Sequence, residues 1–305
     1  MGRAKQDKTI KQLTVSQFES LFPDETACKT YLVAHRWPQG VHCPRCGNAE
    51  LYDASSYQDF HWQCRACAPD GYRFSVLVDT IFENTNKPLK TWFRVIHAML
   101  TAKKGVSALQ IYRTMDIGSY KTAWYMCHRI RAGLADEDFQ KLMGIVEVDE
   151  TFVGGLAKNR HKDKRGDGSG GTGGSGKAIV AGAVQRKGNV VARVIENVKA
   201  STLTEFVRES VSTKVSLLCT DQYPGYRSLD KDFPHSTVDH AAGEYVVGPV
   251  HTQTIEGFWS LVKRGMIGTF HRVSKKYLPL YVAEFRFRYN NRQNPDIFGE
   301  AIKGC

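Results

Sequence analysis

Hydrophobic and polar positions change their period along the chain, and each period predicts a different kind of element. In the first half, apolar residues recur at helical spacing, as they do at Leu89, Trp92, Phe93, Ile96 and Leu100. Residues 88–133 are therefore expected to be largely helical. An earlier helix is predicted over residues 14–36, with Thr14 or Ser16 as its N-terminal cap.

From Gly144 onward the pattern becomes that of strands. The expected strands cover residues 144–153, 177–185, 190–198, 217–221 and the short stretch 237–240. The turn at 187–189 joins the second and third of them as a hairpin, and a helix at 203–211, capped by Ser201 or Thr202, precedes the fourth. Strands interleaved with helices in this order predict an α/β domain with a mixed sheet.

Within the helical region, residues 107–115 and 120–131 are separated by a short turn that contains Gly118. This is the outline of a helix-turn-helix, in which Ser119 can cap the second helix and place Lys121 at its N-terminal end. Recognition helices touch base edges with that end, so we expect DNA contact there. A helical hairpin that only packs against its neighbours is the alternative.

Four of the eight cysteines form two C-x-x-C pairs, Cys43 with Cys46 and Cys64 with Cys67, and 17 residues lie between the pairs. This spacing is typical of a structural zinc site, because four thiolates close a tetrahedral coordination shell. Free buried cysteines would not explain two matched pairs. The other four cysteines are scattered, which favours reduced thiols over a disulfide framework.

The formal net charge of +11 in 305 residues favours an anionic partner, most often nucleic acid, although a generally basic surface would have the same charge. No apolar segment follows the charged N-terminus, so we expect no secretory signal and a cytoplasmic protein. A basic, Gly/Ser-rich insert at 160–176 could clamp a DNA backbone or serve as a plain linker.

Three carboxylates stand where the pattern predicts the ends of buried elements. Asp149 closes the apolar run 145–149, Asp221 closes the run 215–221, and Glu256 lies in a helix-like segment at 254–264. Glu147 shares a strand face with Asp149, whereas Glu150 points the other way, and we favour Asp149 because it ends the run. Such carboxylates can hold a pair of Mg²⁺ ions.

The segment that carries Glu256 has two faces. Glu256 and Lys263 are seven residues apart, which is nearly two helical turns, so both lie on one side with Ser260 between them. The residues expected to dock on the sheet are Ile255, Phe258, Trp259 and Val262. An amphipathic helix with a merely solvated polar side is the simpler alternative.

Asp149, Asp221 and Glu256, with 34 residues between the last two, resemble the DDE triad of bacterial insertion-sequence transposases. Lys263 matches a lysine often found seven residues after that glutamate. The stretches VEVDETFVGG at 146–155, TIEGFWSLVKRG at 254–265 and FRFRYNNR at 285–292 are similar to one subgroup, which has an N-terminal zinc ribbon and an RNase H-like catalytic domain. One departure is Gln253, where relatives often have Asn; we retain Glu256 as the third acid.

The resemblance implies a transposase that cleaves the ends of an insertion sequence and joins the 3′-hydroxyls to target DNA. Mg²⁺ or Mn²⁺ would bind at the three acids and Zn²⁺ at the four cysteines. The residues expected to contact DNA are Lys121, Arg129, Lys263 and Arg264. Double-stranded DNA is the expected partner of a nucleoid-associated homo-oligomer.

The expected domain order is a helical segment at 1–38, a zinc ribbon at 39–85, a helix-turn-helix region at 86–140 and an RNase H-like catalytic domain at 141–298. A flexible basic loop at 158–177 would interrupt the last of these. Two other functions remain open. A nuclease on the same fold would cut without strand transfer, and a non-catalytic regulator would use only the ribbon and the helix-turn-helix to bind DNA.

Overall fold

The computed structural model describes residues 12–135, 140–155, 176–238 and 250–305. The chain divides into two compact units, Met1–Leu134 with Arg292–Cys305, and Ala135–Asn291. The predicted basic insert at 160–176 lies outside the described residues except for Gly176, and so do residues 239 and 240 of the last predicted strand. Within the described ranges, no helix is both long and apolar enough to cross a membrane.

The first unit begins with two helices, α1 (Val15–Leu21) and α2 (Glu25–Arg36), where one helix at 14–36 was predicted. That prediction was wrong because Pro23 lacks an N–H and Asp24 starts a new helix by accepting a hydrogen bond from the Ala27 N–H at 2.8 Å. The cap predicted at Thr14 is confirmed, since its hydroxyl accepts from the Gln17 N–H in a capping box.

A small antiparallel sheet follows, in the order β1 (Tyr52–Asp53), β2 (His61–Cys64) and β3 (Tyr72–Ser75). It is the region of the predicted ribbon. Trp37 packs edge-on against Trp62 and Phe74, with ring centroids 5.6 and 6.1 Å away. These aromatic contacts supply apolar burial in a region with little regular structure.

The remaining helices of this unit are α3 (Leu89–Thr101), α4 (Ala108–Thr114), α5 (Tyr120–Gly133) and α9 (Ile297–Gly304). Helices α4 and α5 pack together in the predicted helix-turn-helix, and Ser119 caps α5 by accepting from the Thr122 N–H. The C-terminal α9 packs on α2 and α3, where Phe298 contacts Phe22 and Phe93. The last helix therefore completes the N-terminal unit.

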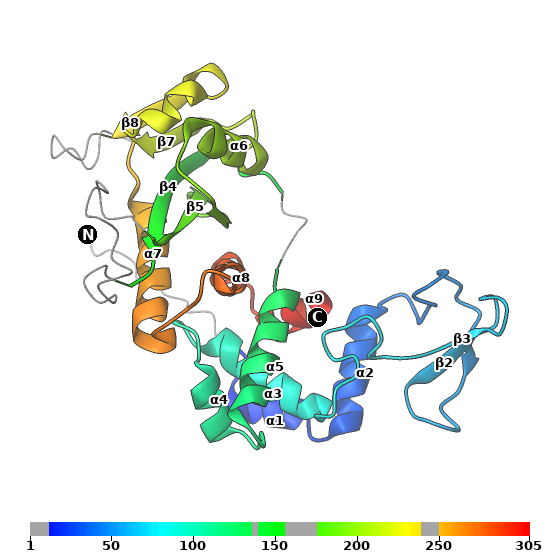
Figure 1. Ribbon diagram of the computed structural model, residues 1–305. Helices are drawn as coiled ribbons and strands as arrows, with labels where there is room; N and C mark the ends of the chain where they lie inside the picture. The colour runs from blue at the N-terminus through cyan, green and yellow to red at the C-terminus, as the bar shows by residue number, and fades with distance from the viewer. Residues whose placement is uncertain (1–11, 136–139, 156–175, 239–249) are drawn as a thin grey trace, which may run out of the picture. The chain divides into compact units, whose positions relative to one another are not determined.

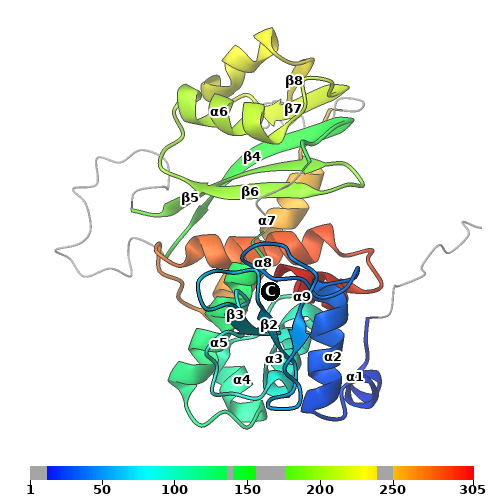
Figure 2. The same cartoon turned by 90° about the vertical axis from the view of Figure 1, so that its right-hand side faces the viewer.

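The second unit is built on a five-stranded mixed sheet in the order β6-β5-β4-β7-β8 (Figures 1 and 2). Its strands are β4 (Ile145–Val153), β5 (Ala178–Gln185), β6 (Val190–Ile195), β7 (Leu217–Asp221) and β8 (His235–Val238). The pairs β6–β5 and β5–β4 are antiparallel, whereas β4–β7 and β7–β8 are parallel. This is the predicted RNase H-like mixed sheet.

The two faces of the sheet are covered by separate layers. Successive residues of a strand point to opposite faces, so alternate residues belong to two different apolar clusters. The 3₁₀ segment η3 (Pro224–Lys231) and α6 (Ala200–Ser210) pack on one face. Helices α7 (Gln253–Gly265) and α8 (Leu278–Asn290) pack on the other, with the short π-helix η4 (Met266–Phe270) after α7.

The start of α6 differs from the prediction, which placed its cap at Ser201 or Thr202. The helix begins at Ala200 after Lys199, and no side chain of the described residues caps its N–H groups. The Thr202 hydroxyl instead donates to Asn197 Oδ1 at 2.9 Å. Tertiary packing of Leu203 and Phe206 on the sheet stabilises the helix without a polar cap.

Candidate active site and zinc centre

Asp149 and Asp221 stand at the same level on neighbouring parallel strands. In the register of β4 and β7, Glu147 lies opposite Cys219. Each aspartate comes two residues after its member of that pair, so both follow the same step along their strands. Asp221 ends β7 as predicted, but Asp149 lies in the middle of β4, because β4 continues to Val153 in its pairing with β5. The register of the two strands nevertheless brings the aspartates to the same level.

The face on which Asp149 lies follows from its partner on β5. Asp149 is opposite Gly182, whose neighbours Val180 and Val184 belong to the cluster that packs on α7. Glu150 lies on the other face, where its carboxylate accepts a 2.5 Å hydrogen bond from the Tyr226 hydroxyl. The predicted division of these acids between two faces of the strand is confirmed.

Helix α7 brings the third carboxylate. Ile255, Phe258, Trp259 and Val262 are buried, whereas Glu256, Ser260 and Lys263 are exposed. The two faces predicted for this helix are therefore confirmed. The Thr252 hydroxyl donates to Glu256 Oε1 at 2.8 Å and so constrains the carboxylate at the start of the helix.

Gly182 lets α7 lie close to the sheet. A Cβ at this position would lie 2.5 and 2.7 Å from two carbons of the Trp259 indole, which is too close for any side chain. Trp259 is only 3% exposed. The indole is thus a core residue, as predicted for the face of this helix that docks on the sheet, and it is not available to stack on a DNA base.

The three acids share one electrostatic environment. Burial raises the pKa of Asp149 to about 7, and the charges of Glu150, Asp221 and Glu256 add to the shift. Burial also raises the pKa of Glu150, although its bond from Tyr226 opposes the shift. A site that disfavours its own negative charge gains most from a bound cation, which reverses the local electrostatics.

A nucleophilic thiol in this site is disfavoured. Cys219 lies two residues before Asp221, but it is fully buried in β7. Burial raises the pKa of its thiol, so the reactive thiolate is not favoured at neutral pH. Cys219 is therefore a core residue of β7.

The four paired cysteines form the predicted cluster at the ribbon. Among the described residues, Cys43, Cys46, Cys64 and Cys67 form the one group of metal-ligating side chains whose ligand atoms all lie within 4.8 Å of one another. Their Sγ atoms are 3.5 to 3.7 Å apart where hydrogen-bond geometry pairs them. A tetrahedron with Zn–S bonds of about 2.3 Å has edges of about 3.8 Å, so the cluster fits Zn²⁺.

Comparison with known proteins identifies the family. Residues 141–290 match the ISXO2-like transposase domain, and residues 23–69 match the transposase zinc-ribbon domain. The chain belongs to this transposase family. A Halobacterium salinarum protein named "Uncharacterized protein in transposable element ISH50" is 30% identical over 297 residues, which cover 92% of the transposase and 96% of the relative. No solved structure matches the transposase.

The residues predicted to contact DNA differ in how available they are. Lys121 and Lys263 are exposed, and so is Arg264, whose Nε donates to the Ser260 carbonyl. Arg129 is half-buried, and its guanidinium donates to the Glu83 carbonyl at 3.3 Å. Part of the hydrogen-bonding capacity of Arg129 is therefore used within the protein and is not available to DNA.

Sequence reasoning missed the role of Glu147. From the sequence, Glu147 was only an alternative to Asp149 as a metal ligand. In the structure, Glu147 is completely buried and its carboxylate points toward the start of α7. A buried carboxylate inside an apolar run was the signal that could have prompted a search for its hydrogen-bond donors. Its partners come from distant parts of the sequence and could not be predicted.

Proposed function

We propose that the transposase cleaves the ends of its element and joins the resulting 3′-hydroxyls to target DNA at one site formed by Asp149, Asp221 and Glu256. The observation that carries the proposal is the matched level of the two aspartates on β4 and β7, with Glu256 on the helix that covers the same face. The charge interaction of Asp149 with both other acids supports it.

The donor set suits Mg²⁺ or Mn²⁺, because all three residues offer hard carboxylate oxygens. Asp149 and Asp221 would hold the ions from the sheet, and Glu256 would hold them from α7. Among the described residues, the three acids do not form a ligand group as compact as that of the cysteines. A two-metal site places its ions about 3.5–4 Å apart, so its ligands need not all meet at one point. When bound, these ions supply nucleophile activation and neutralise charge on the scissile phosphate.

Basic side chains of the transposase would position the DNA. Lys263 lies on the exposed face of α7 that carries Glu256, so it can reach a phosphate beside the acids, with Arg264 next to it. Lys121 at the N-terminal end of α5, followed by Arg129, would contact the element end. Two ends must meet before joining, so we propose a homo-oligomer on double-stranded DNA, within the nucleoid.

The test uses labelled DNA ends from the flanks of the gene, a plasmid target and Mg²⁺. The wild-type protein is expected to produce free 3′-hydroxyls and joined products. Asp149→Asn, Asp221→Asn and Glu256→Gln should each lower both reactions by at least about 1000-fold, a loss of about 4 kcal/mol in transition-state stabilisation. All three should still bind the ends. Asp232→Asn, which alters an exposed carboxylate paired with Arg208, is the control.

Two results would replace this function with another. Cleavage without joined products, under conditions where both DNA partners are bound, would identify a nuclease. Activity in cells that survives all three substitutions would identify a DNA-binding regulator that needs no carboxylate chemistry.

A further inference from the structure

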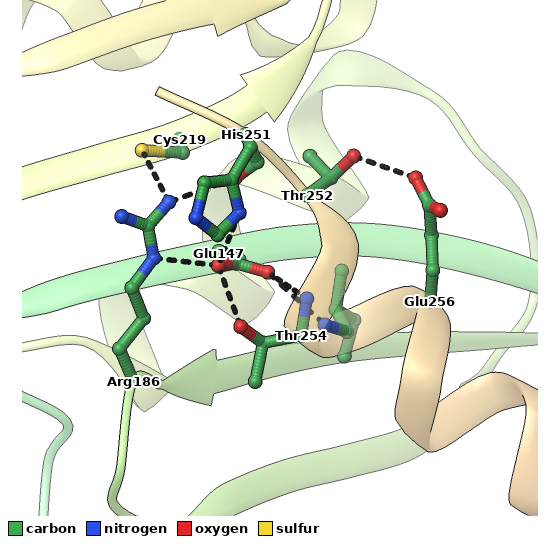
Figure 3. Close-up of polar contacts among 8 residues, drawn as sticks. Glu147, Arg186, Cys219, His251, Thr252, Thr254 and Glu256 are labelled. Carbon is green, nitrogen blue, oxygen red and sulfur yellow. Dashed lines mark hydrogen bonds and ion pairs between the residues drawn. The ribbon is translucent and has the colours of Figure 1, made fainter. Parts of the chain in front are cut away.

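Glu147 is a buried carboxylate surrounded by hydrogen-bond donors (Figure 3). Its Oε2 accepts from the backbone N–H groups of Thr254 at 2.7 Å and Ile255 at 3.1 Å. Its Oε1 accepts from the Thr254 hydroxyl at 2.8 Å and from Arg186 Nε at 2.6 Å. These four contacts all use Glu147 as an acceptor, which is the arrangement a carboxylate requires when it is removed from water.

The two backbone donors belong to the first turn of α7. N–H groups at the start of a helix lack partners within the helix. Thr252 is the N-cap residue, but among the described residues its hydroxyl donates to Glu256 Oε1 and does not accept from that turn. Glu147 therefore does from β4 what a capping side chain does locally, and it ties the helix to the strand that carries Asp149.

Arg186 extends the connection to the segment that enters α7. Besides its bond to Glu147, its Nη2 donates to the His251 carbonyl at 3.1 Å. The Arg186 N–H donates to the Ile145 carbonyl at 3.0 Å, which anchors the residue at the start of β4. The His251 ring lies beside the same carboxylate, with Nδ1 at 3.2 Å from Glu147 Oε1 but not in hydrogen-bond geometry. The entry to α7 is thus attached to the sheet through the hydrogen bonds of Glu147 and Arg186.

We propose that Glu147 is a positioning residue that fixes the register of α7 on β4, so that Glu256 comes to face Asp149, and that Thr252 orients the Glu256 carboxylate. Glu147 stands two residues before Asp149, and Thr252 stands four before Glu256. Glu147 aligns α7 on the strand, and Asp149, the next residue on the same face of β4, then faces the Glu256 carboxylate. This inference rests on the proposed function of the three carboxylates.

A positioning role and a merely stabilising role make different predictions for metal binding. If Glu147 only stabilises the fold, then any substitution in the unit that lowers the free energy of unfolding equally should change the cation affinity equally. If it positions Glu256, the affinity for a divalent cation falls beyond what stability explains. Residues that orient metal ligands typically change affinity by about 10- to 100-fold when substituted.

The experiment measures Mn²⁺ binding to the full-length protein by electron paramagnetic resonance, with Mn²⁺ alone as the probe. Glu147→Gln keeps the shape of the side chain but replaces one acceptor oxygen with a donor, and Thr252→Val removes the hydroxyl bonded to Glu256. Val207→Ala, in the cluster on the opposite face of the sheet, is the matched destabilising control. Hydrogen exchange at Thr254 and Ile255 is followed in the same samples.

Glu147→Gln is expected to weaken Mn²⁺ binding by about 10-fold or more and to accelerate exchange in the first turn of α7. Thr252→Val should weaken binding by a smaller factor without faster exchange at that turn. Val207→Ala should lower the melting temperature and leave both readouts near those of the wild type. This pattern would support the proposal.

Mn²⁺ affinity in Glu147→Gln equal to that of Val207→Ala at matched stability would overturn it. If Glu147→Gln does not fold, Thr252→Val decides the question alone, and unchanged Mn²⁺ affinity there overturns the proposal. Failure of the proposed function looks different, because the wild type and Asp149→Asn would then bind Mn²⁺ equally. That result would reject the carboxylate site and, with it, this inference.

Discussion

The zinc ribbon and the carboxylate site hold their ligands in opposite ways. In the ribbon, four cysteines come from a stretch of 25 residues, and two of them stand in each short turn. Their Sγ atoms already lie at distances that suit a tetrahedral ion. In the second unit, the three acids come from two strands and a helix, and they span 108 residues of sequence.

Spacing in the sequence predicts the geometry of a site by itself only where the ligands are close together along the chain. A C-x-x-C turn brings two thiols together by its own geometry, whatever packs around it. Carboxylates repel one another and do not approach without support from the fold. The second unit supplies that support through strand register, the close approach of α7 at Gly182 and the buried Glu147.

The largest effect expected from this contrast is the loss of the ribbon when its metal is removed. A strong zinc chelator, or Cys64→Ser, should unfold the region around β1–β3, since structural zinc contributes about 10–16 kcal/mol in small domains. Tryptophan fluorescence from Trp37 and Trp62 would report the loss, and metal analysis should find one zinc per chain. Removal of Mg²⁺ should leave the fold intact. Unchanged fluorescence in zinc-free protein would contradict the prediction.

A smaller effect is expected where α7 meets the sheet. Gly182→Ala places a methyl group against the Trp259 indole and should lower the free energy of unfolding by about 2 kcal/mol through overpacking. The matched control is Gly257→Ala on α7 itself, where an added Cβ meets no atom of the described residues within 4 Å. That substitution should stabilise the helix by about 0.5–1 kcal/mol. Urea unfolding measures both, and equal effects of the two variants would rule out the close approach.

The pH dependence of stability tests the charge at the carboxylate site. Burial raises the pKa of Asp149 in the folded protein to about 7, from an ordinary pKa of 3.8. Between these values the folded state binds more protons than the unfolded state, so this residue makes stability fall as pH rises from about 4 to 7. Asp149→Asn should therefore raise the free energy of unfolding by about 1–2 kcal/mol at pH 8 without Mg²⁺. Parallel pH profiles of wild type and variant, measured by urea unfolding, would contradict this expectation.

The smallest effect concerns the basic side chains next to the three acids. Lys263→Ala should weaken DNA binding by about 1 kcal/mol and reduce the slope of log affinity against log salt by about 0.9, the value for one phosphate contact. Lys214→Ala removes an exposed lysine elsewhere in the same unit and is the control. Binding titrations at several salt concentrations measure the slopes. Equal slopes for Lys263→Ala and Lys214→Ala would place Lys263 away from the DNA.

Much of the fold could be predicted because its signals are local. The strand at 217–221 was predicted to the residue, and the caps at Thr14 and Ser119 were identified from their side chains. The single helix predicted over 14–36 failed because the apolar period continued across a proline that breaks it. The cap of α6 failed because packing, and not a polar side chain, defines where that helix starts.

The candidate site was predicted in part. Asp149 and Asp221 could be selected because each ends an apolar run, and Glu256 because it lies on the polar side of a helix-like segment. Their assignment as metal ligands stays a prediction. The donors around Glu147 could not be found, since Thr254 and Arg186 are 107 and 39 residues away from it. Arg129 could be selected as a cation on a helix, but its bond to the Glu83 carbonyl depends on the packing of another segment.

By itself the sequence determined the zinc cluster, the alternation of strand faces and the two-sided character of α7, because each depends on residues only a few positions apart. Only the tertiary structure decided that Glu147 holds α7 on β4, that Gly182 admits Trp259 and that α9 completes the N-terminal unit. Those outcomes depend on which surfaces meet after the chain has folded. Close packing and the burial of charge select them, and neither acts within a short window of sequence.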